Sequence, residues 1–461
     1  MHEQPQRATS ASTLREEIRL QALLVAPLLG TYLADLCLFY IDHAIVGRLG
    51  AVELGAVGLS GMVFFELLII ASAILSVIGV IVGNAFGAGD PGLVSRAVGK
   101  GLVASAYLSL PVMIVGWYLM DLLALTGQDP EVVRLGEEYV QAMLWMVPAS
   151  LGFVALRNFV TGLSRPGIVT IVFTLALPVN LALNWWLVFG GFGLPGFGVA
   201  GAGYASAIVG WLMFFALVAY IQRDPVLRAY QVFRNLRTSD PDLSRKIWRL
   251  GLPVAGLTIV EGSFFNMVII AAGLFGAMAL AANQIVINTI AVAWTLAMSI
   301  GEAAAVRVSQ ENGHGNIRAA HRAGWLAIGV SCVAGLAFMV LLLLTPDLVA
   351  TVFLDTTSAD NAQVLDAVRA LGLVAAVVAL FDVVQVVAAR CLRGLEDTVM
   401  PMILTALGYW VFALPLGLAL AFVFELGIIG LWIGLSAGIA FSGLLMIYRW
   451  YRFSTAVKLV N

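Results

Sequence analysis

Charged residues are scarce in this chain of 461 residues, of which Asp, Glu, Lys and Arg together make up 11%. Hydrophobic residues make up 61%, and the mean hydropathy is +0.97. Since ordinary soluble domains have about 25% charged residues, this composition excludes a water-soluble globular protein. It indicates an integral membrane protein, for which the bilayer is the solvent.

Histidine and cysteine are also rare. Four histidines leave little material for a metal site such as HExxH, and the phosphate-binding pattern GxxxxGK[ST] does not occur, so a membrane enzyme and direct use of ATP are both disfavoured. The three cysteines lie within or at the ends of apolar stretches, which argues against a disulfide framework. We therefore expect no enzymatic activity, no cofactor and no resident metal.

Long apolar runs recur along the whole chain, whereas the alternation typical of strands does not. A helix needs about 20 apolar residues to cross a hydrocarbon core of roughly 30 Å. The pattern Thr13-Leu-Arg-Glu16 predicts a helix start before the first run, which we expect to serve as the insertion signal. The predicted membrane spans are 20–47, 53–83, 94–124, 133–163, 167–192, 197–222, 246–274, 277–306, 319–345, 363–393, 397–424 and 427–449.

The placement of basic residues predicts the orientation, because short loops rich in Lys and Arg stay in the cytoplasm. With twelve spans, Arg48, Arg134 and Arg369 fall on one side, and the rest of the 25 Lys and Arg residues fall on the other. Both termini are therefore expected in the cytoplasm. The basic loop 223–249 is expected to touch lipid headgroups rather than nucleic acid.

The chain contains an internal duplication. Pro27 to Gly50 aligns without a gap to Pro253 to Gly276, which places Asp35 opposite Glu261. Two further pairs follow: Gly87-Ala-Gly-Asp with Glu311-Asn-Gly-His, and Val160-Thr-Gly-Leu-Ser with Leu392-Arg-Gly-Leu-Glu. Each repeat would hold six spans, and an even number means that the two repeats run parallel in the membrane.

These observations predict an all-α integral membrane protein with twelve transmembrane helices, in two six-helix bundles related by pseudo-twofold symmetry. Such duplicated bundles are a recurrent layout of transporters, with the substrate bound between them near the bilayer midplane. The predicted parts are a cytoplasmic segment 1–19, an N-lobe 20–222, a cytoplasmic linker 223–245, a C-lobe 246–452 and a cytoplasmic tail 453–461.

Five acidic residues fall inside predicted spans: Asp35, Asp42, Glu66, Glu261 and Asp382. Each costs roughly 2.5 to 3.5 kcal/mol near the bilayer centre, so its presence requires a reason. No Lys or Arg lies near mid-span to pair with them. A carboxylate without a fixed cation must be protonated or hold a mobile cation, which is the chemistry of a sodium or proton coupling site.

Polar residues at helical spacing accompany these acids. Asp35 and Asp42 lie two turns apart and share a face, and Asn180 and Asn184 lie one turn apart. In the second half, Asp382 and Gln385 lie one turn apart, and so do Gln284 and Asn288. The pattern predicts one polar cluster inside each bundle.

Structural roles compete with these assignments. Asn184 and Asn288 are as well explained as interhelical contacts, and Asp35 and Glu66 nearly as well as satisfied packing groups. Phe264 and Phe265 are more often packing residues than aromatic walls of a cation-binding cavity. Glu302, near Arg307 at the end of its span, is expected to form half of a structural ion pair, and His43 to make a helix-interface or solvent contact.

At these residues the chain resembles the multidrug and toxic compound extrusion (MATE) family, particularly its NorM-like bacterial branch. The likeness covers all twelve spans. The stretches that carry it are Tyr40-Ile-Asp-His-Ala-Ile-Val-Gly47, Gly251-Leu-Pro-Val254 through Glu261, Ala281-Ala-Asn-Gln-Ile-Val-Ile-Asn288, Ala305-Val-Arg-Val308, Asp382-Val-Val-Gln385 and Leu392-Arg-Gly394, with Leu156-Arg157, Gly162 and Asn184-Trp185 in the first half.

The resemblance implies a V-shaped exporter in a bacterial-type inner membrane, which exchanges organic compounds for Na⁺ or H⁺. By motif, Asp42 would be the ion site of the N-lobe, supported by Asn180 and Asn184, and Glu261 with Asp382 would be the ion site of the C-lobe. Small organic cations are the expected substrates, the bilayer is the expected partner, and the chain is expected to be a monomer. Gln284 would line the cavity.

The chain departs from the family pattern at three positions. Val378 stands where the NorM-like branch often has Tyr, one turn before the Asp of span 10, and the acids Asp35 and Glu66 are unusual. The coupling ion and the charge of the substrate are therefore left open. Two alternatives also stay open: a flippase of lipid-linked oligosaccharides, which would be expected to carry cations in its cavity, and a polytopic membrane enzyme.

Overall fold

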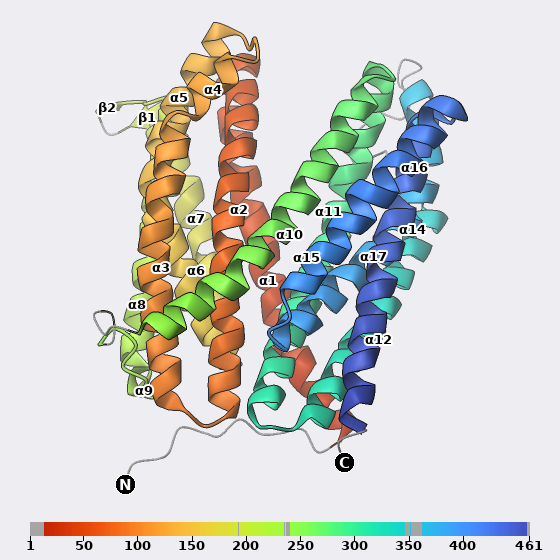
Figure 1. Ribbon diagram of the computed structural model, residues 1–461. Coiled ribbons are helices and arrows are strands. Elements are labelled where there is room, and N and C mark those ends of the chain that lie inside the picture. The colour runs from red at the N-terminus through yellow and green to blue at the C-terminus, as the bar shows by residue number, and fades with distance from the viewer. Residues whose placement is uncertain are drawn as a thin grey trace. The chain divides into compact units, whose positions relative to one another are not determined.

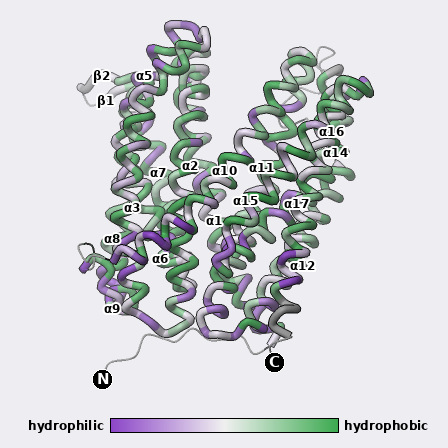
Figure 2. Tube along the Cα trace, viewed as in Figure 1, coloured by the Kyte–Doolittle hydropathy of each residue, from purple (hydrophilic) through white to green (hydrophobic). Residues whose placement is uncertain are grey.

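The computed structural model describes residues 13–191, 193–234, 236, 240–345, 351 and 362–458. Within these residues, twelve helical stretches are long and apolar enough to cross a membrane, and each overlaps one predicted span. Hydrophobic residues run along most of their length (Figure 2). Parts of three predicted segments lie outside the described residues. These parts are 1–12 of the expected N-terminal segment 1–19, residues 235 and 237–239 of the linker, and 459–461 of the tail 453–461.

The described chain packs as two compact units. Unit 1 takes in Ala26–Ala255, and unit 2 takes in the described residues up to Val25 together with those from Gly256 onward. The division therefore falls inside the first helix of each sequence repeat, and the packing boundaries differ from the repeat boundaries by several residues. The physical reason is that the first turns of each of these long helices pack with the other repeat's helices.

Unit 1 is built on α2, which packs against α3, α5 and α6, while α8 packs against α5 and α7 (Figure 1). Two residues at each end of the α7–α8 connection form a small antiparallel pair that the sequence did not predict. The elements are α1 (Leu14–Val46), α2 (Ala51–Gly87), α3 (Pro91–Trp117), α4 (Leu119–Ala124), α5 (Pro130–Met143), the 3-10 turn η1 (Leu144–Met146), α6 (Val147–Gly162), α7 (Gly167–Phe189), β1 (Gly190–Gly191), β2 (Leu194–Pro195), α8 (Val199–Arg223) and α9 (Pro225–Ala229).

Unit 2 is built on α14, which packs against α11, α12 and α17 (Figure 1). One of its spans is irregular, because two π-helical segments interrupt the α-helix between Val399 and Val423. The elements are α10 (Pro241–Gly273), α11 (Ala277–Gly313), α12 (Ile317–Leu344), α14 (Ala362–Gly394), α15 (Val399–Ala406), η3 (Leu407–Ala413), α16 (Leu414–Leu418), η4 (Ala419–Val423) and α17 (Gly427–Lys458).

The turns of the two repeats are equivalent, and they correct one predicted pairing. After α2, Gly89 has a positive φ and Asp90 caps α3 by accepting a hydrogen bond from Leu93 N–H. After α11, Gly315 has a positive φ and Asn316 caps α12 in the same way. The pairing of Gly87 with Glu311 was therefore wrong by two residues, because the left-handed glycine and its polar cap define the turn rather than the more variable residues around them.

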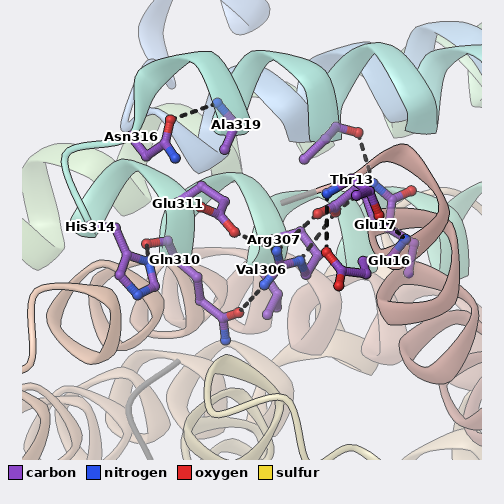
Figure 3. Close-up of polar contacts among 12 residues, drawn as sticks. Thr13, Glu16, Glu17, Val306, Arg307, Gln310, Glu311, His314, Asn316 and Ala319 are labelled. Carbon is purple, nitrogen blue, oxygen red and sulfur yellow. Dashed lines mark hydrogen bonds and ion pairs between the residues drawn. The ribbon is translucent and has the colours of Figure 1, made fainter. Parts of the chain in front are cut away.

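The start of α1 is anchored in unit 2. Glu16 N–H donates to Thr13 Oγ1, and Thr13 N–H donates to Glu16 Oε2, which confirms the predicted capping pattern. Beside it, Arg307 of α11 donates to both carboxylate oxygens of Glu17, at 3.1 and 2.9 Å, and also to Glu311 (Figure 3). All three of these ion-pair residues are at most 3% exposed, so the network is buried.

Candidate ion and substrate site

Asp42 lies at the centre of a buried polar cluster in unit 1. The carboxylate is contributed by α1 and is 5% exposed. Asn184 and Asn180 of α7 donate to its Oδ1 at 2.8 and 3.2 Å, so the one-turn spacing of the two amides does place both against the same carboxylate. All of these donors are neutral, and Asp42 forms no ion pair within the described residues.

Two residues of the Asp42 cluster were missed by sequence reasoning. Ser206 of α8 donates to Asp42 Oδ2 at 2.7 Å. Tyr139 of α5 is fully buried, interacts electrostatically with Asp42, and has a hydroxyl with no hydrogen-bond partner among the residues that the structure describes. Neither residue follows a helical spacing from Asp42, because each is brought to the site by a different helix.

Unused oxygens surround this carboxylate. The Oδ1 atoms of Asn180 and Asn184 are buried and have no hydrogen-bond partner in the described part of the chain. An unsatisfied buried acceptor is costly, and hard cations such as Na⁺ take carboxylate, amide and hydroxyl oxygens as ligands. The cluster therefore has the donor set for a small cation and also, at Asp42, a group that can accept a proton. His43, in contrast, uses Nδ1 to bond Phe39 O within its own helix, at 2.9 Å.

Unit 2 contains a pair of carboxylates. Glu261 of α10 is half-buried, Asp382 of α14 is 4% exposed, and the two interact electrostatically. Neither forms a hydrogen bond or an ion pair within the described part of the chain. Two carboxylates held together in this way repel each other when both are charged, so a shared proton or cation would stabilise the pair.

Gln385, one turn after Asp382, is held in place on both sides. Its Nε2 donates to Thr405 Oγ1 at 3.4 Å, and its Oε1 accepts from Tyr409 Oη at 3.0 Å. Gln385, Thr405 and Tyr409 are all buried. The hydroxyls of Thr405 and Tyr409 belong to the span with π-helical segments, and sequence spacing gave no signal for either of them.

The amides of α11 lie differently from the prediction. Gln284 is exposed and Asn288 half-buried, and neither forms a hydrogen bond with any described residue. The buried amide of this helix is Asn283, whose Oδ1 accepts from Trp432 Nε1 at 2.9 Å. The structure therefore brings Gln385 into the buried cluster of unit 2 but places no hydrogen bond between the α11 amides and the carboxylate pair.

The remaining predicted residues are divided between surface and core. Asp35 is exposed and Glu66 half-buried, and neither forms a hydrogen bond or an ion pair within the described residues. Phe264 is 1% exposed and packs on Tyr409, with ring centroids 5.0 Å apart, so it belongs to the core rather than to an exposed cavity wall. Phe265 is half-buried.

Two arginines interact electrostatically with acids of the membrane spans, without hydrogen bonds or ion pairs to them among the described residues. Arg157 interacts electrostatically with Asp35, and Arg390 with Glu261, without forming an ion pair in either case. Arg390 and Arg393 pair instead with Glu302, at 3.6 and 2.6 Å. The predicted ion pair of Glu302 is thus present, but not with its near neighbour Arg307: five residues along a helix place two side chains on different faces.

The same duplication is visible in the comparison with known proteins. The MatE family model matches the chain twice, over residues 27–186 and 253–419, and the two matches begin at the aligned prolines Pro27 and Pro253.

The chain belongs to the MatE family.

Relatives of similar length support this membership. A protein of Mesorhizobium japonicum named "Probable multidrug resistance protein NorM" is 34% identical over 95% of this chain and 94% of its own length. A protein of the same name from Rhodopseudomonas palustris is also 34% identical, over 96% and 93%. The chain is accordingly a NorM-like MatE protein, as its motifs predicted.

Solved structures confirm the predicted fold of two six-helix bundles. The eukaryotic MATE transporter AtDTX14 superposes with a TM-score of 0.83 at 20% identity, over 94% of this chain and 95% of that one. A Vibrio cholerae MATE transporter, VcmN, superposes with a TM-score of 0.86 at 15% identity, over 97% and 99%.

Proposed function

We propose that this chain is a secondary active exporter of varied organic compounds, which antiports a cationic substrate against Na⁺ or H⁺ by alternating access. The names of its relatives refer to multidrug resistance, and we extend that activity to this chain. The proposed location is the inner membrane of a bacterial-type cell, with both termini in the cytoplasm.

The observation that carries the proposal is that three acids in the membrane spans form no ion pair with a basic residue in the described part of the chain. Asp42 is buried among neutral donors, and Glu261 and Asp382 have no hydrogen-bond or ion-pair partner in the described part of the chain. Buried carboxylates without a fixed cation are strongly disfavoured as ions. A travelling Na⁺ or H⁺ would neutralise them in one state of the cycle and leave in the other.

The mechanism needs no other source of energy. One charge that moves through 100 mV supplies about 2.3 kcal/mol. That energy sustains roughly a fiftyfold substrate gradient, because a factor of ten corresponds to about 1.4 kcal/mol. Entry of the ion neutralises a carboxylate, changes the packing of the helices that carry it, and thereby lowers the affinity for the compound to be exported.

The flippase alternative is less well supported. A carrier of lipid-linked oligosaccharide has to bind a pyrophosphate, for which Arg or Lys side chains are the usual partners. The acids Asp35, Asp42, Glu66, Glu261 and Asp382 lie in the spans instead, and the arginines Arg390 and Arg393 are engaged by Glu302.

Transport by the purified full-length chain in proteoliposomes tests the proposal. Vesicles loaded with ethidium should release it when a sodium or a proton gradient is imposed, and release should stop when an ionophore collapses that gradient. Protein-free vesicles serve as the control for leakage. Release at the same rate with and without each gradient would reject antiport, and release only of a fluorescent lipid-linked pyrophosphate would favour the flippase.

A further inference from the structure

Tyr409 occupies an unusual piece of backbone in unit 2. It is the third residue of the π-helical segment η3, and Leu414 N–H bonds to Tyr409 O, five residues back. A π-helical segment is a rare interruption of an α-helix and is found frequently at functional sites. The π-helical backbone changes the direction in which the side chains of this span project, and Tyr409 projects into the core, where it is 1% exposed.

The side chain of Tyr409 contacts both helices that carry the acid pair. Its hydroxyl donates to Gln385 Oε1 at 3.0 Å, and Gln385 lies one turn from Asp382 on α14. Its ring packs on Phe264, with centroids 5.0 Å apart, and Phe264 lies one turn from Glu261 on α10. Tyr409 also interacts electrostatically with both carboxylates.

This double contact links the two helices that carry the acids. When the shared proton or cation leaves, Glu261 and Asp382 repel each other, and the repulsion drives α10 and α14 apart. The hydrogen bond to Gln385 and the ring contact with Phe264 oppose that separation. Thr405, which accepts from Gln385 Nε2, fixes the amide so that its Oε1 faces the phenol.

We propose that Tyr409 is a positioning residue for ion coupling, which holds Asp382 and Glu261 at the separation at which they share one coupling ion. The inference rests on the proposed antiport and goes beyond it, because it assigns a role to a side chain outside both acid-bearing helices. The phenol acts through Gln385 and Phe264 and does not itself have to bind the ion.

The test compares Tyr409→Phe with wild type in proteoliposomes, with ethidium release measured over a range of imposed Na⁺ and H⁺ gradients. The variant keeps the ring on Phe264 and loses only the hydroxyl. We expect the half-saturating concentration of the coupling ion to rise about tenfold, which corresponds to about 1.4 kcal/mol, with little change in the maximal rate of release.

Two further variants separate positioning from stability. Trp432→Phe is the matched control, since Trp432 is as buried in unit 2 as Tyr409 and its indole bonds to Asn283 Oδ1 on α11 rather than to a group on α10 or α14. Tyr409→Phe combined with Gln385→Leu removes the acceptor that the single variant leaves unpaired, so thermal stability should recover while the half-saturating ion concentration stays raised.

The outcomes are distinct. An unchanged half-saturating ion concentration in Tyr409→Phe would overturn the inference and leave antiport intact. An equal rise in Trp432→Phe, or full recovery of ion affinity in the double variant, would also overturn it, because the effect would then be one of packing. If wild type releases ethidium independently of both gradients, the antiport proposal fails, and this inference fails with it.

Discussion

Asp42 is stabilised by three hydrogen bonds from neutral groups and forms no ion pair among the described residues. Such donors keep a buried carboxylate in place without neutralising it. The oxygens of the two amides accept no hydrogen bond from any described residue, so the cluster can rearrange around an arriving cation by turning an amide. The geometry suits reversible binding better than a permanent salt bridge would.

The hydroxyl of Ser206 is expected to contribute to ion binding at Asp42. Ser206→Ala removes the 2.7 Å bond to Asp42 Oδ2, and a hydrogen bond to a charged group contributes about 1.5 to 3 kcal/mol. We expect the half-saturating ion concentration for ethidium release to change at least tenfold. Ser109→Ala is the control, because Ser109 is 3% exposed and its hydroxyl bonds, among the described residues, only to Ser105 O in its own helix. Equal behaviour of the two variants would contradict a role for Ser206 at the site.

Some residues of the Asp42 cluster could be predicted from the sequence, and others could not. Asn180 and Asn184 could be assigned to Asp42 because one-turn spacing and the family motif agree, and their hydrogen bonds place them there. Ser206 and Tyr139 could not, since spacing along one helix says nothing about which other helices pack beside it. For Phe264 the sequence favoured packing but left a cavity wall open, because periodicity does not distinguish a cavity face from a packed face.

Helices are the scale at which hydropathy is most informative. All twelve spans were predictable, because a helix that crosses a bilayer must be apolar over a minimum length. The π-helical segments η3 and η4 were not, since they depend on how one span packs against its neighbours. The change of unit within α1 and α10 was equally hidden, because it is a property of packing.

The buried network at the start of α1 predicts a large loss of stability in Arg307→Met. The change leaves Glu17 and Glu311 buried without the guanidinium that bonds both, and breaking a buried ion pair costs about 3 to 5 kcal/mol. Thermal unfolding in detergent should begin at a clearly lower temperature. Arg134→Met, which removes an exposed ion pair with Glu131, should leave the midpoint almost unchanged. Equal midpoints for the two variants would show that the network does not stabilise unit 2.

The space around a glycine predicts whether its replacement by alanine lowers or raises thermal stability, and Gly434 and Gly329 differ in this respect. A Cβ on Gly434 would lie 2.4 Å from the backbone of Gly417, so Gly434→Ala should destabilise by about 1 to 3 kcal/mol through overpacking. Gly329 of α12 has open space around it, and Ala is the better helix former. Thermal unfolding of Gly329→Ala should therefore occur at the wild-type temperature or above. A higher midpoint for Gly434→Ala would contradict the packing.

At the scale of the whole chain, one duplicated scaffold carries two dissimilar clusters. The repeat that pairs Pro27 with Pro253 places Val268, a buried apolar residue, opposite Asp42. The pairing of Gly162 with Gly394 places Ser150 opposite Asp382. Glu261 is paired with Asp35, which is exposed rather than enclosed. Duplication therefore accounts for the equivalent turns and helix order, whereas the polar clusters differ between the two halves.

Coupling through these acids is the claim on which the proposed function depends most. The direct measurement follows ethidium release and ion entry together in the same proteoliposomes, for wild type, Asp42→Asn and Asp382→Asn. Each substitution keeps the shape of the side chain and removes its charge. We expect both variants to insert and to unfold near the wild-type temperature, while ion-driven release falls at least tenfold and ion entry falls with it. Release and ion entry at wild-type rates in both folded variants would contradict the mechanism.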